Sequence, residues 1–438
     1  MMKLKTILTL VFTLLIVVEY SNAQEIKLSK YKFGEGLNFS GIDKNYKMEI
    51  SGYIQPYLES KKYLDNNDAT FYNRFRMRRA RFRLQGSAAQ EKLTYRLQLD
   101  LTGGNDGADT PTGGLITDAW VSYDITKRIS LTFGQKAPGS DNRELTMAST
   151  TLQLADRSPL TGAFASIREF GFFAESTHKV SRYSYIKSEI AVTNGDGANV
   201  IGKDHGGLKY GGRIDYLPFG LFSSSGQYRQ ADLVRELTPK FVIGGNYSYN
   251  VGISDKRGSE GGRYIYLDAN NKELLPDFVK YGVDFLFKYR GYSVLGEYVN
   301  TSSRVPSGIT QRYRNDGTIS TTFLVNGIPD VANYVKGKMM VGEGYNIQGG
   351  YVFKNNISID GRFAHLKPEA NSFLNNPTSY NRSHFYTLGI TKYLDRNYGA
   401  KIQLDCTYIN AKPGSNNVNE LPVNGDEILT RLITTISF

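Results

Sequence analysis

Residues 91–103 read EKLTYRLQLDLTG and alternate between apolar and polar side chains. Because successive side chains of a β-strand point to opposite faces, a strand here has one apolar and one polar face. The apolar positions are Leu93, Tyr95, Leu97, Leu99 and Leu101, and the polar positions are Thr94, Arg96, Gln98, Asp100 and Thr102. A half-buried strand of a soluble sandwich shows the same local pattern. The number and arrangement of such segments must therefore distinguish the two folds.

The alternation recurs along the whole chain and predicts sixteen strands. They lie near residues 46–58, 71–86, 91–103, 115–123, 129–135, 167–176, 181–193, 208–216, 239–251, 278–290, 292–300, 341–354, 357–366, 384–393, 399–409 and 427–438. Many have about the 9–11 residues that a tilted transmembrane strand needs. An even number of strands is typical of bacterial outer-membrane barrels. We therefore predict an all-β fold, a transmembrane antiparallel β-barrel of about 16 strands.

The connections between these strands support the same fold, because short and long ones alternate. The short ones are 124–128, 177–180, 290–291, 354–356 and 395–397, and the long ones are 59–70, 104–114, 136–166, 194–207, 252–277, 301–340, 367–383 and 410–426. Outer-membrane barrels have short periplasmic turns and long extracellular loops, whereas a sandwich gives no reason for this asymmetry. One connection, 217–238, is long where a periplasmic turn is expected.

Both ends of the chain carry export features. Lys3 and Lys5 precede an apolar run, Ile7–Val18, and small residues stand before Gln24, so residues 1–23 read as a signal peptide. The alternative, a membrane anchor, requires a longer apolar run. The chain ends in ILTRLITTISF, and a terminal aromatic such as Phe438 resembles the signal that outer-membrane assembly machinery recognises. We expect residues 24–438 to form a barrel in the outer membrane of a Gram-negative bacterium, with residues 24–45 as a disordered or periplasmic lead-in.

The composition limits how the chain can be stabilised and which classes of partner it can bind. Cys406 is the only cysteine, so no internal disulfide is available to an exported chain of 438 residues. Beyond the signal no apolar run is long enough for a spanning helix, so membrane insertion must use strands. The net charge of +11 falls to +10 once two lysines and one glutamate leave with the signal. Such charge suits nucleic acid, an anionic membrane surface or anionic solutes. Export argues against nucleic acid.

The most basic stretch, RFRMRRARFR at residues 74–83, lies within one predicted strand. Its apolar residues change from odd to even positions between Met77 and Ala80. An undistorted strand would place arginines in lipid, at about 2–4 kcal/mol each near the midplane. A β-bulge at Arg78–Arg79 removes this conflict. The prediction is then that Phe75, Met77, Ala80, Phe82 and Leu84 face lipid, while Arg74, Arg76, Arg78, Arg79, Arg81 and Arg83 face the lumen.

The neighbouring inward positions bear on the charge of this wall. They are Lys47, Glu49, Arg96 and Asp100, which leaves eight basic against two acidic residues. A ladder with an excess of about six positive charges would attract anions and repel cations. The alternative is that loop acids neutralise the arginines, and Asp141, Glu144 and Asp156 are the candidates.

A family resemblance adds to this reading. The segments RMRRARFRLQG (76–86), TDAWVSYDI (117–125) and GQKAPG (134–139), with later pieces such as GGRIDYLPFG and GYNIQGGYVF in the same order, resemble the phosphate-selective porins O and P. The resemblance implies a sixteen-stranded homotrimer with arginines along an anion path. It also implies that the third extracellular loop, here residues 136–166, folds into the lumen as a constriction.

The same resemblance assigns residues to the pore. Arg78 and Arg79 match the paired pore arginines, Lys136 stands at the start of the constriction loop, and Asp118 matches an acidic pore residue. Ser140, Ser149 and Ser158 are candidates for the rest of a phosphate site. The solute implied is a small anion such as phosphate or polyphosphate, which crosses by passive diffusion.

Other motifs do not indicate catalysis. The stretch GGNDGADTPTGG (103–114) is typical of a turn-rich loop rather than a calcium site. The four histidines show no metal spacing, and no serine–histidine pair or phosphate loop is readable. We therefore predict no cofactor and no enzyme. Two alternatives stay open, a general or oligosaccharide-preferring porin and an outer-membrane barrel hydrolase.

Overall fold

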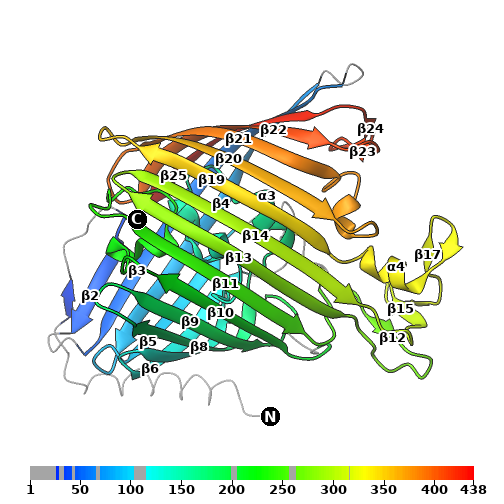
Figure 1. The fold of residues 1–438 in the computed structure, drawn as a ribbon, viewed down its shortest axis with the longest axis horizontal. Coiled ribbons are helices and arrows are strands. Elements are labelled where there is room, and N and C mark those ends of the chain that lie inside the picture. Colours follow the sequence, from blue (N-terminus) through cyan, green and yellow to red (C-terminus); the bar gives the residue numbers. More distant parts are fainter. Residues whose placement is uncertain are drawn as a thin grey trace, which may run out of the picture.

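The computed structural model describes residues 26–28, 34–41, 45–65, 70–102, 115–198, 205–255, 263–314 and 316–438. The predicted signal peptide, 1–23, and the stretch 103–114 lie outside the described residues. Sixteen antiparallel strands form a closed barrel (Figure 1). They are β3 (Lys47–Tyr63), β4 (Phe71–Ala88), β5 (Leu93–Asp100), β6 (Ile116–Thr126), β7 (Ile129–Lys136), β8 (Glu169–Lys179), β9 (Tyr185–Thr193), β10 (Lys209–Leu217), β11 (Lys240–Asn250), β13 (Asp277–Tyr289), β14 (Tyr292–Arg304), β19 (Gly342–Val352), β20 (Ile357–Pro368), β21 (Arg382–Tyr393), β22 (Ala400–Ala411) and β25 (Glu427–Ser437). The predicted fold class and strand number are confirmed.

The barrel closes between its first and last long strands. β25 pairs antiparallel with β3, with Ile428 opposite Lys62 and Ile436 opposite Ile54. The backbones of Gly52 and Phe438 exchange two hydrogen bonds of 2.9 Å at the end of this seam. Closure leaves no strand edge unpaired in the membrane. Among the described residues, no helix is long and apolar enough to cross a membrane.

The two faces of the barrel differ as the sequence alternation predicts. Large apolar side chains are exposed on the outer face, for example Phe75, Phe172, Ile190 and Leu388. The inner face carries buried polar and charged side chains, which include Gln55, Lys280, Gln348, Asp360 and Asp405. This arrangement is inside-out relative to a soluble protein, because lipid covers one face and polar groups fill the other.

One predicted connection is wrong in length. Residues 59–70 were expected to be a loop, but β3 runs on to Tyr63 and leaves only 64–70 before β4, which begins at Phe71 as expected. Beyond Leu58 the strand is polar on both faces, so the alternation that marks a strand disappears. The strands still pair there, with Glu59 opposite Arg74 and Lys62 opposite Phe71.

The remaining elements belong to connections. The long loops carry α2 (Arg143–Thr146), η2 (Ser149–Thr151), α3 (Pro159–Phe164), β12 (Tyr266–Leu267), β15 (Gln311–Tyr313), β16 (Ile319–Ser320), β17 (Leu324–Val325), β18 (Ile328–Pro329), α4 (Val331–Lys336), η4 (Phe373–Asn375), β23 (Ser415–Asn416) and β24 (Pro422–Val423). Figure 1 shows β12, β15, β17 and α4 projecting from one end of the barrel. We call this the long-loop end and the opposite end the short-turn end.

Two strands lie within the segment 24–45 before the barrel, so this lead-in is not wholly disordered, and its expected periplasmic position stays a prediction. β2 (Leu37–Gly41) pairs with residues 47–50 of β3, and β1 (Ile26–Leu28) pairs with β2. These two strands continue the sheet at the short-turn end, beyond the point where Phe438 closes the seam.

Candidate functional site

Residues 137–168, here called the lumen loop, cross the interior of the barrel. Asp141 forms an ion pair with Lys280 of β13, the backbone N–H of Ala155 donates to Asp405 of β22 at 2.8 Å, and Gln153 donates to Asp360 of β20 at 2.6 Å. Within the loop, Ser158 caps α3 by accepting from the N–H of Thr161, and Pro159 occupies the first helical turn. The loop is therefore held against the wall opposite the strand from which it starts.

A second segment enters from the short-turn end. Residues 218–239, here called the turn insert, form the connection that is too long for a periplasmic turn; they include η3 (Ser223–Tyr228). Lys288 of β13 donates to the carbonyl oxygens of Gly226 and Ala231 at 2.9 and 3.0 Å. Ala231 and Leu233 also pack with Val352, Tyr393 and Tyr398 from other strand ends. The turn insert thus covers the short-turn opening beneath β11 to β22.

The lumen loop and the turn insert meet at Gln230. Its side-chain oxygen accepts from the N–H of Gln153 at 2.8 Å and from Gln348 of β19 at 2.9 Å, and its amide donates to Glu144 at 2.9 Å. All four side chains are buried. Protein therefore fills the side of the lumen that faces β11 to β22, and a passage has to follow the opposite wall.

A cavity of about 490 Å³ lies on that opposite side, against β3 to β9. Its charged lining is more basic than acidic. The six basic residues are Arg81, Arg83, Arg96, Lys136, Arg157 and Arg168, and the four acidic residues are Asp118, Asp124, Glu175 and Glu189. A smaller cavity of about 190 Å³ shares Gly139, Glu189 and Tyr228 with it and reaches Lys127 and Arg128 in the β6–β7 turn. The two cavities extend toward the short-turn end.

The basic strand β4 contains the predicted bulge. Gln55 of β3 lies opposite Arg79, and the next residue, Pro56, lies opposite Met77, so Arg78 is the extra residue. Pro56 has no N–H to donate, which makes it a natural place for the ladder to break. Phe75 is 82% exposed on the outer face, whereas Arg78 and Arg79 are 7% and 1% exposed. The bulge prediction is confirmed.

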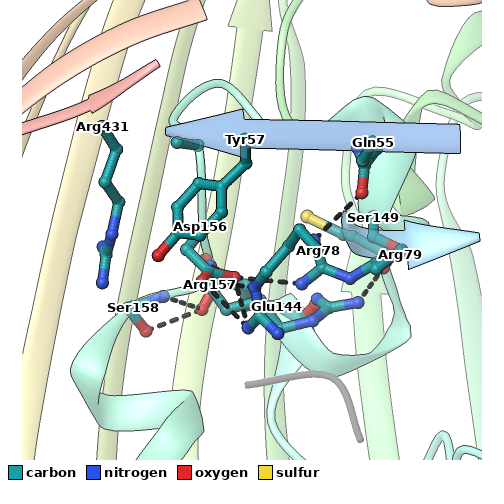
Figure 2. Close-up of polar contacts among 12 residues, drawn as sticks. Gln55, Tyr57, Arg78, Arg79, Glu144, Ser149, Asp156, Arg157, Ser158 and Arg431 are labelled. Atoms are coloured by element: carbon teal, nitrogen blue, oxygen red, sulfur yellow. Dashed lines mark hydrogen bonds and ion pairs between the residues drawn. The ribbon is translucent and has the colours of Figure 1, made fainter. Parts of the chain in front are cut away.

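Arg78 and Arg79 contact an acid of the lumen loop (Figure 2). Arg78 donates to both carboxylate oxygens of Asp156, from Nε at 3.0 Å and from Nη2 at 3.2 Å. Arg79 donates to Asp156 at 3.0 Å and to Gln55 at 3.1 Å. Burial alone would raise the pKa of Asp156, but the charges of Arg78 and Arg79 outweigh it and hold this pKa well below its usual range.

The arginines nearer the long-loop end are also paired. Arg74 binds Glu59 at 2.8 Å, and Arg431 of β25 binds the other oxygen of Glu59 at 3.0 Å. Arg76 donates to the hydroxyl of Tyr57 at 3.2 Å. The expected excess of about six charges is therefore too large. Glu59 was left out because the predicted strand ended at residue 58, whereas β3 continues to Tyr63. Asp156 was weighed only as an alternative.

Arg81, Arg83 and Arg96 continue the ladder into the cavity, and their partners differ. Arg81 pairs with Asp100 at 2.9 Å. Arg83 donates to the neutral Gln98 at 2.7 and 2.9 Å, and Arg96 donates to Gln85 at 3.0 Å and lies 5.2 Å from the Trp120 ring. Within the described part of the chain, no carboxylate lies within ion-pair distance of Arg83 or Arg96.

Asp118 and Lys136 both line the cavity, each beside an opposite charge. Asp118 accepts from Arg168 at 2.8 Å. Lys136, the last residue of β7, forms ion pairs with Glu175 and, at 3.6 Å, with Glu189. Sequence reasoning missed these three partners, since no distinguishing motif marks Arg168, the last residue of the lumen loop, or the two glutamates in β8 and β9.

The three candidate serines separate in the structure. Ser149 lines the cavity, where its hydroxyl lies 2.8 Å from that of Tyr53 and accepts from Arg81 at 3.3 Å. Ser158 instead donates to Glu144 at 2.6 Å, and the backbone N–H of Ser140 donates to Glu189 at 2.7 Å. Of the three acids weighed as neutralising partners, only Asp156 reaches the basic strand. Asp141 pairs with Lys280 instead, and Glu144 accepts from Ser158. Among the described residues, no group of three or more His, Cys, Asp or Glu could hold a metal ion.

Comparison with known proteins adds to this geometry. Residues 59–206 match the family model of the phosphate-selective porins O and P. The match spans β4, the lumen loop and most of the cavity wall. Together with the closed sixteen-stranded barrel, this match supports an outer-membrane porin of a Gram-negative bacterium.

Solved structures resemble this chain in fold. OprB of Pseudomonas putida has a TM-score of 0.51 at 11% identity, over 91% of this chain and 95% of that one. The outer-membrane channel DcaP of Acinetobacter baumannii has a TM-score of 0.49 at 10% identity, over 91% and 99%. An anion-selective porin of Comamonas acidovorans has a TM-score of 0.48 at 10% identity, over 90% and 100%. No curated protein sequence matches the chain significantly.

Proposed function

We propose that this porin conducts small anions passively, with inorganic phosphate as the leading solute, along the wall formed by β3 to β9. The observation that carries the proposal is the pair Arg83 and Arg96. Both line the cavity, and both hydrogen bond to neutral glutamines rather than to carboxylates. Their charges are therefore available to a passing ion, while most other cations of the lining have an acidic neighbour.

The physical mechanism is partial replacement of hydration. A guanidinium group presents a planar fork of N–H donors that matches the oxygens of phosphate. Arg83 and Arg96 offer two such forks within one cavity, and Ser149 adds a hydroxyl group there. Several weak contacts in sequence let an anion enter and still leave, which conduction requires. The solute moves down its gradient, so the proposal is a channel and not an enzyme.

The choice of phosphate as the solute and the proposed oligomeric state both rest on the resemblance to the family. The family model that matches residues 59–206 describes phosphate-selective porins, and phosphate or polyphosphate is the solute we carry over from it. From the same resemblance we propose a homotrimer embedded in outer-membrane lipid. We also propose that the outer-membrane assembly machinery recognises Phe438, which follows the last residue of β25.

The test replaces the two charges that lack acidic partners. Arg83→Gln with Arg96→Gln is expected to lower the chloride-over-potassium permeability ratio about fivefold, since a unit charge about 4 Å from an ion contributes about 1 kcal/mol in water. The reversal potential of single channels across a potassium chloride gradient measures this ratio. Phosphate should also block the chloride current of the unmodified porin.

The matched control removes two exposed charges outside the cavity. Arg182→Gln with Arg396→Gln takes the same charge from turns at the short-turn end and should leave the ratio unchanged. Cation preference of the unmodified porin would contradict the proposal, as would an unchanged ratio in the Arg83 and Arg96 variant. Block by maltodextrin without block by phosphate would favour the oligosaccharide-preferring porin. Ester hydrolysis without conductance would favour the barrel hydrolase.

A further inference from the structure

Asp156 holds an unusual position for a carboxylate. It lies on the lumen loop, yet its side chain reaches the most basic part of the β4 wall (Figure 2). Two guanidinium groups donate three hydrogen bonds of 3.0–3.2 Å to its two oxygens. The Asp156 side chain is 12% exposed, and those of Arg78 and Arg79 are 4% and 1% exposed. The contact is therefore a nearly dry, bidentate recognition of an anion.

The chemistry of this contact is that of an oxyanion site. Arginine forks bind carboxylate and phosphate oxygens with the same planar, bidentate geometry. Further positive charge surrounds the carboxylate. Arg362 of β20 donates to the backbone oxygen of Asp156 at 2.9 Å, and Arg431 of β25 points toward the same part of the loop. An oxyanion placed where the Asp156 side chain lies would meet the donors of Arg78 and Arg79.

Residues other than Asp156 anchor the lumen loop to the far wall, and the Asp156 carboxylate accepts one backbone hydrogen bond within the loop, from the N–H of Arg157 at 3.2 Å. The N–H of Ala155 binds Asp405 at 2.8 Å, and Leu152 accepts from Gln403 at 3.1 Å. The Asp156 side chain can therefore leave the arginines while its neighbours stay attached to the far wall. The pair Arg81–Asp100 differs, because both of its members belong to paired strands, β4 and β5.

We propose that Asp156 is a tethered competitor for an oxyanion site formed by Arg78 and Arg79, and that a permeating small oxyanion displaces its carboxylate. The inference rests on the proposed function and adds a residue that sets affinity. A competing group lowers the apparent affinity of a site by the fraction of time that the site is available. Weak apparent affinity favours release, so the competitor speeds passage through the most basic part of the wall.

The competition is expected to persist across ordinary pH. The charges of Arg78 and Arg79 keep the pKa of Asp156 well below its usual range despite burial. A carboxyl with a lowered pKa loses its contact only as the pH falls through that lowered value. Between about pH 5 and 8 the carboxylate stays ionised, so acidification in this window does not imitate its removal.

The experiment neutralises the competitor and keeps its shape. Asp156→Asn is expected to lower the inorganic phosphate concentration that half-blocks the chloride current by about tenfold or more, because the arginine donors are then available in most channels. Asp141→Asn is the matched control. It removes a buried carboxylate from the same loop and from a pair with a wall cation, Lys280, but leaves Arg78 and Arg79 with Asp156. Phosphate binding to the detergent-purified porin, measured by calorimetry, should change in parallel.

The outcomes separate the two proposals. If the unmodified porin prefers cations and phosphate does not block it, both the proposed function and this inference fail. If the unmodified porin prefers anions but Asp156→Asn binds phosphate no more tightly than Asp141→Asn, only the competitor is ruled out. Weaker phosphate binding in Asp156→Asn would show that the carboxylate positions the arginines instead. Asp156→Ser repeats the measurement if the asparagine variant does not assemble.

Discussion

Replacing residues 219–238 with an Asn-Gly turn is expected to raise the single-channel conductance roughly twofold or more, since an unobstructed barrel of 16 strands encloses an aqueous channel. The turn insert closes the short-turn opening beneath β11 to β22, where Lys288 binds two of its carbonyl oxygens at 2.9 and 3.0 Å. Asn-Gly suits the tight turn that β10 and β11 would then need. Removal opens a second side of the lumen to water, and Lys288 becomes hydrated there.

A control for this deletion shortens a connection outside the lumen. Among the strands that the structure describes, β17 and β18 pair only with each other, and Ile328 is 67% exposed. Replacing residues 324–329 with a short Gly-Ser link should leave the conductance unchanged. Conductance that stays the same in the Asn-Gly variant, with the barrel assembled, would show that the turn insert does not obstruct the passage.

The second large effect concerns the bulge. Arg78→Ala with Arg79→Ala is expected to destabilise the barrel by about 3–5 kcal/mol, because removing one side of a buried ion pair leaves a buried charge uncompensated. The charge left behind is Asp156, whose side chain is 12% exposed. The same variant should lose anion preference. Thermal unfolding in detergent measures the first effect, and the reversal potential measures the second.

A third substitution separates charge from packing in this variant. Adding Asp156→Asn to the two alanines removes the uncompensated carboxylate and should restore most of the lost stability, without restoring anion preference. If the destabilisation is equally large with and without Asp156, then lost packing of the arginine side chains, and not an unpaired charge, accounts for it.

The barrel itself was predictable because the membrane imposes a simple rule on each strand. Lipid on one face and polar groups on the other give the period of two seen from Leu93 to Leu101. The bulge was predictable for the same reason, since the apolar residues change parity between Met77 and Ala80. The rule fails at the rim of the membrane, where both faces are polar, and so the continuation of β3 through Glu59 was missed.

The interior of the barrel follows no such rule. Which lumen cation meets which loop acid depends on the path of the loop, and spacing along the chain does not specify it. Asp156 reaches Arg78 across 78 positions and Asp141 reaches Lys280 across 139, although both acids lie in one loop. The turn insert was visible only as excess length. Nothing in the residues around Gln230 indicated that this segment turns inward to meet the lumen loop.

The bulge also determines how β4 tolerates changes in length. The five arginines other than Arg78 divide into two groups, with Arg74 and Arg76 at even numbers and Arg79, Arg81 and Arg83 at odd numbers. A single extra residue brings both groups to the lumen face. Loss of that one residue would exchange inside and outside for everything on one side of it. Arg74 and Arg76 would then meet lipid while Phe75 and Met77 met water. For this strand, whether an odd or an even number of residues is deleted matters more than which residues they are. Removal of Arg78 would reverse the facing of the side chains on one side of the bulge, which is more than the loss of one charge.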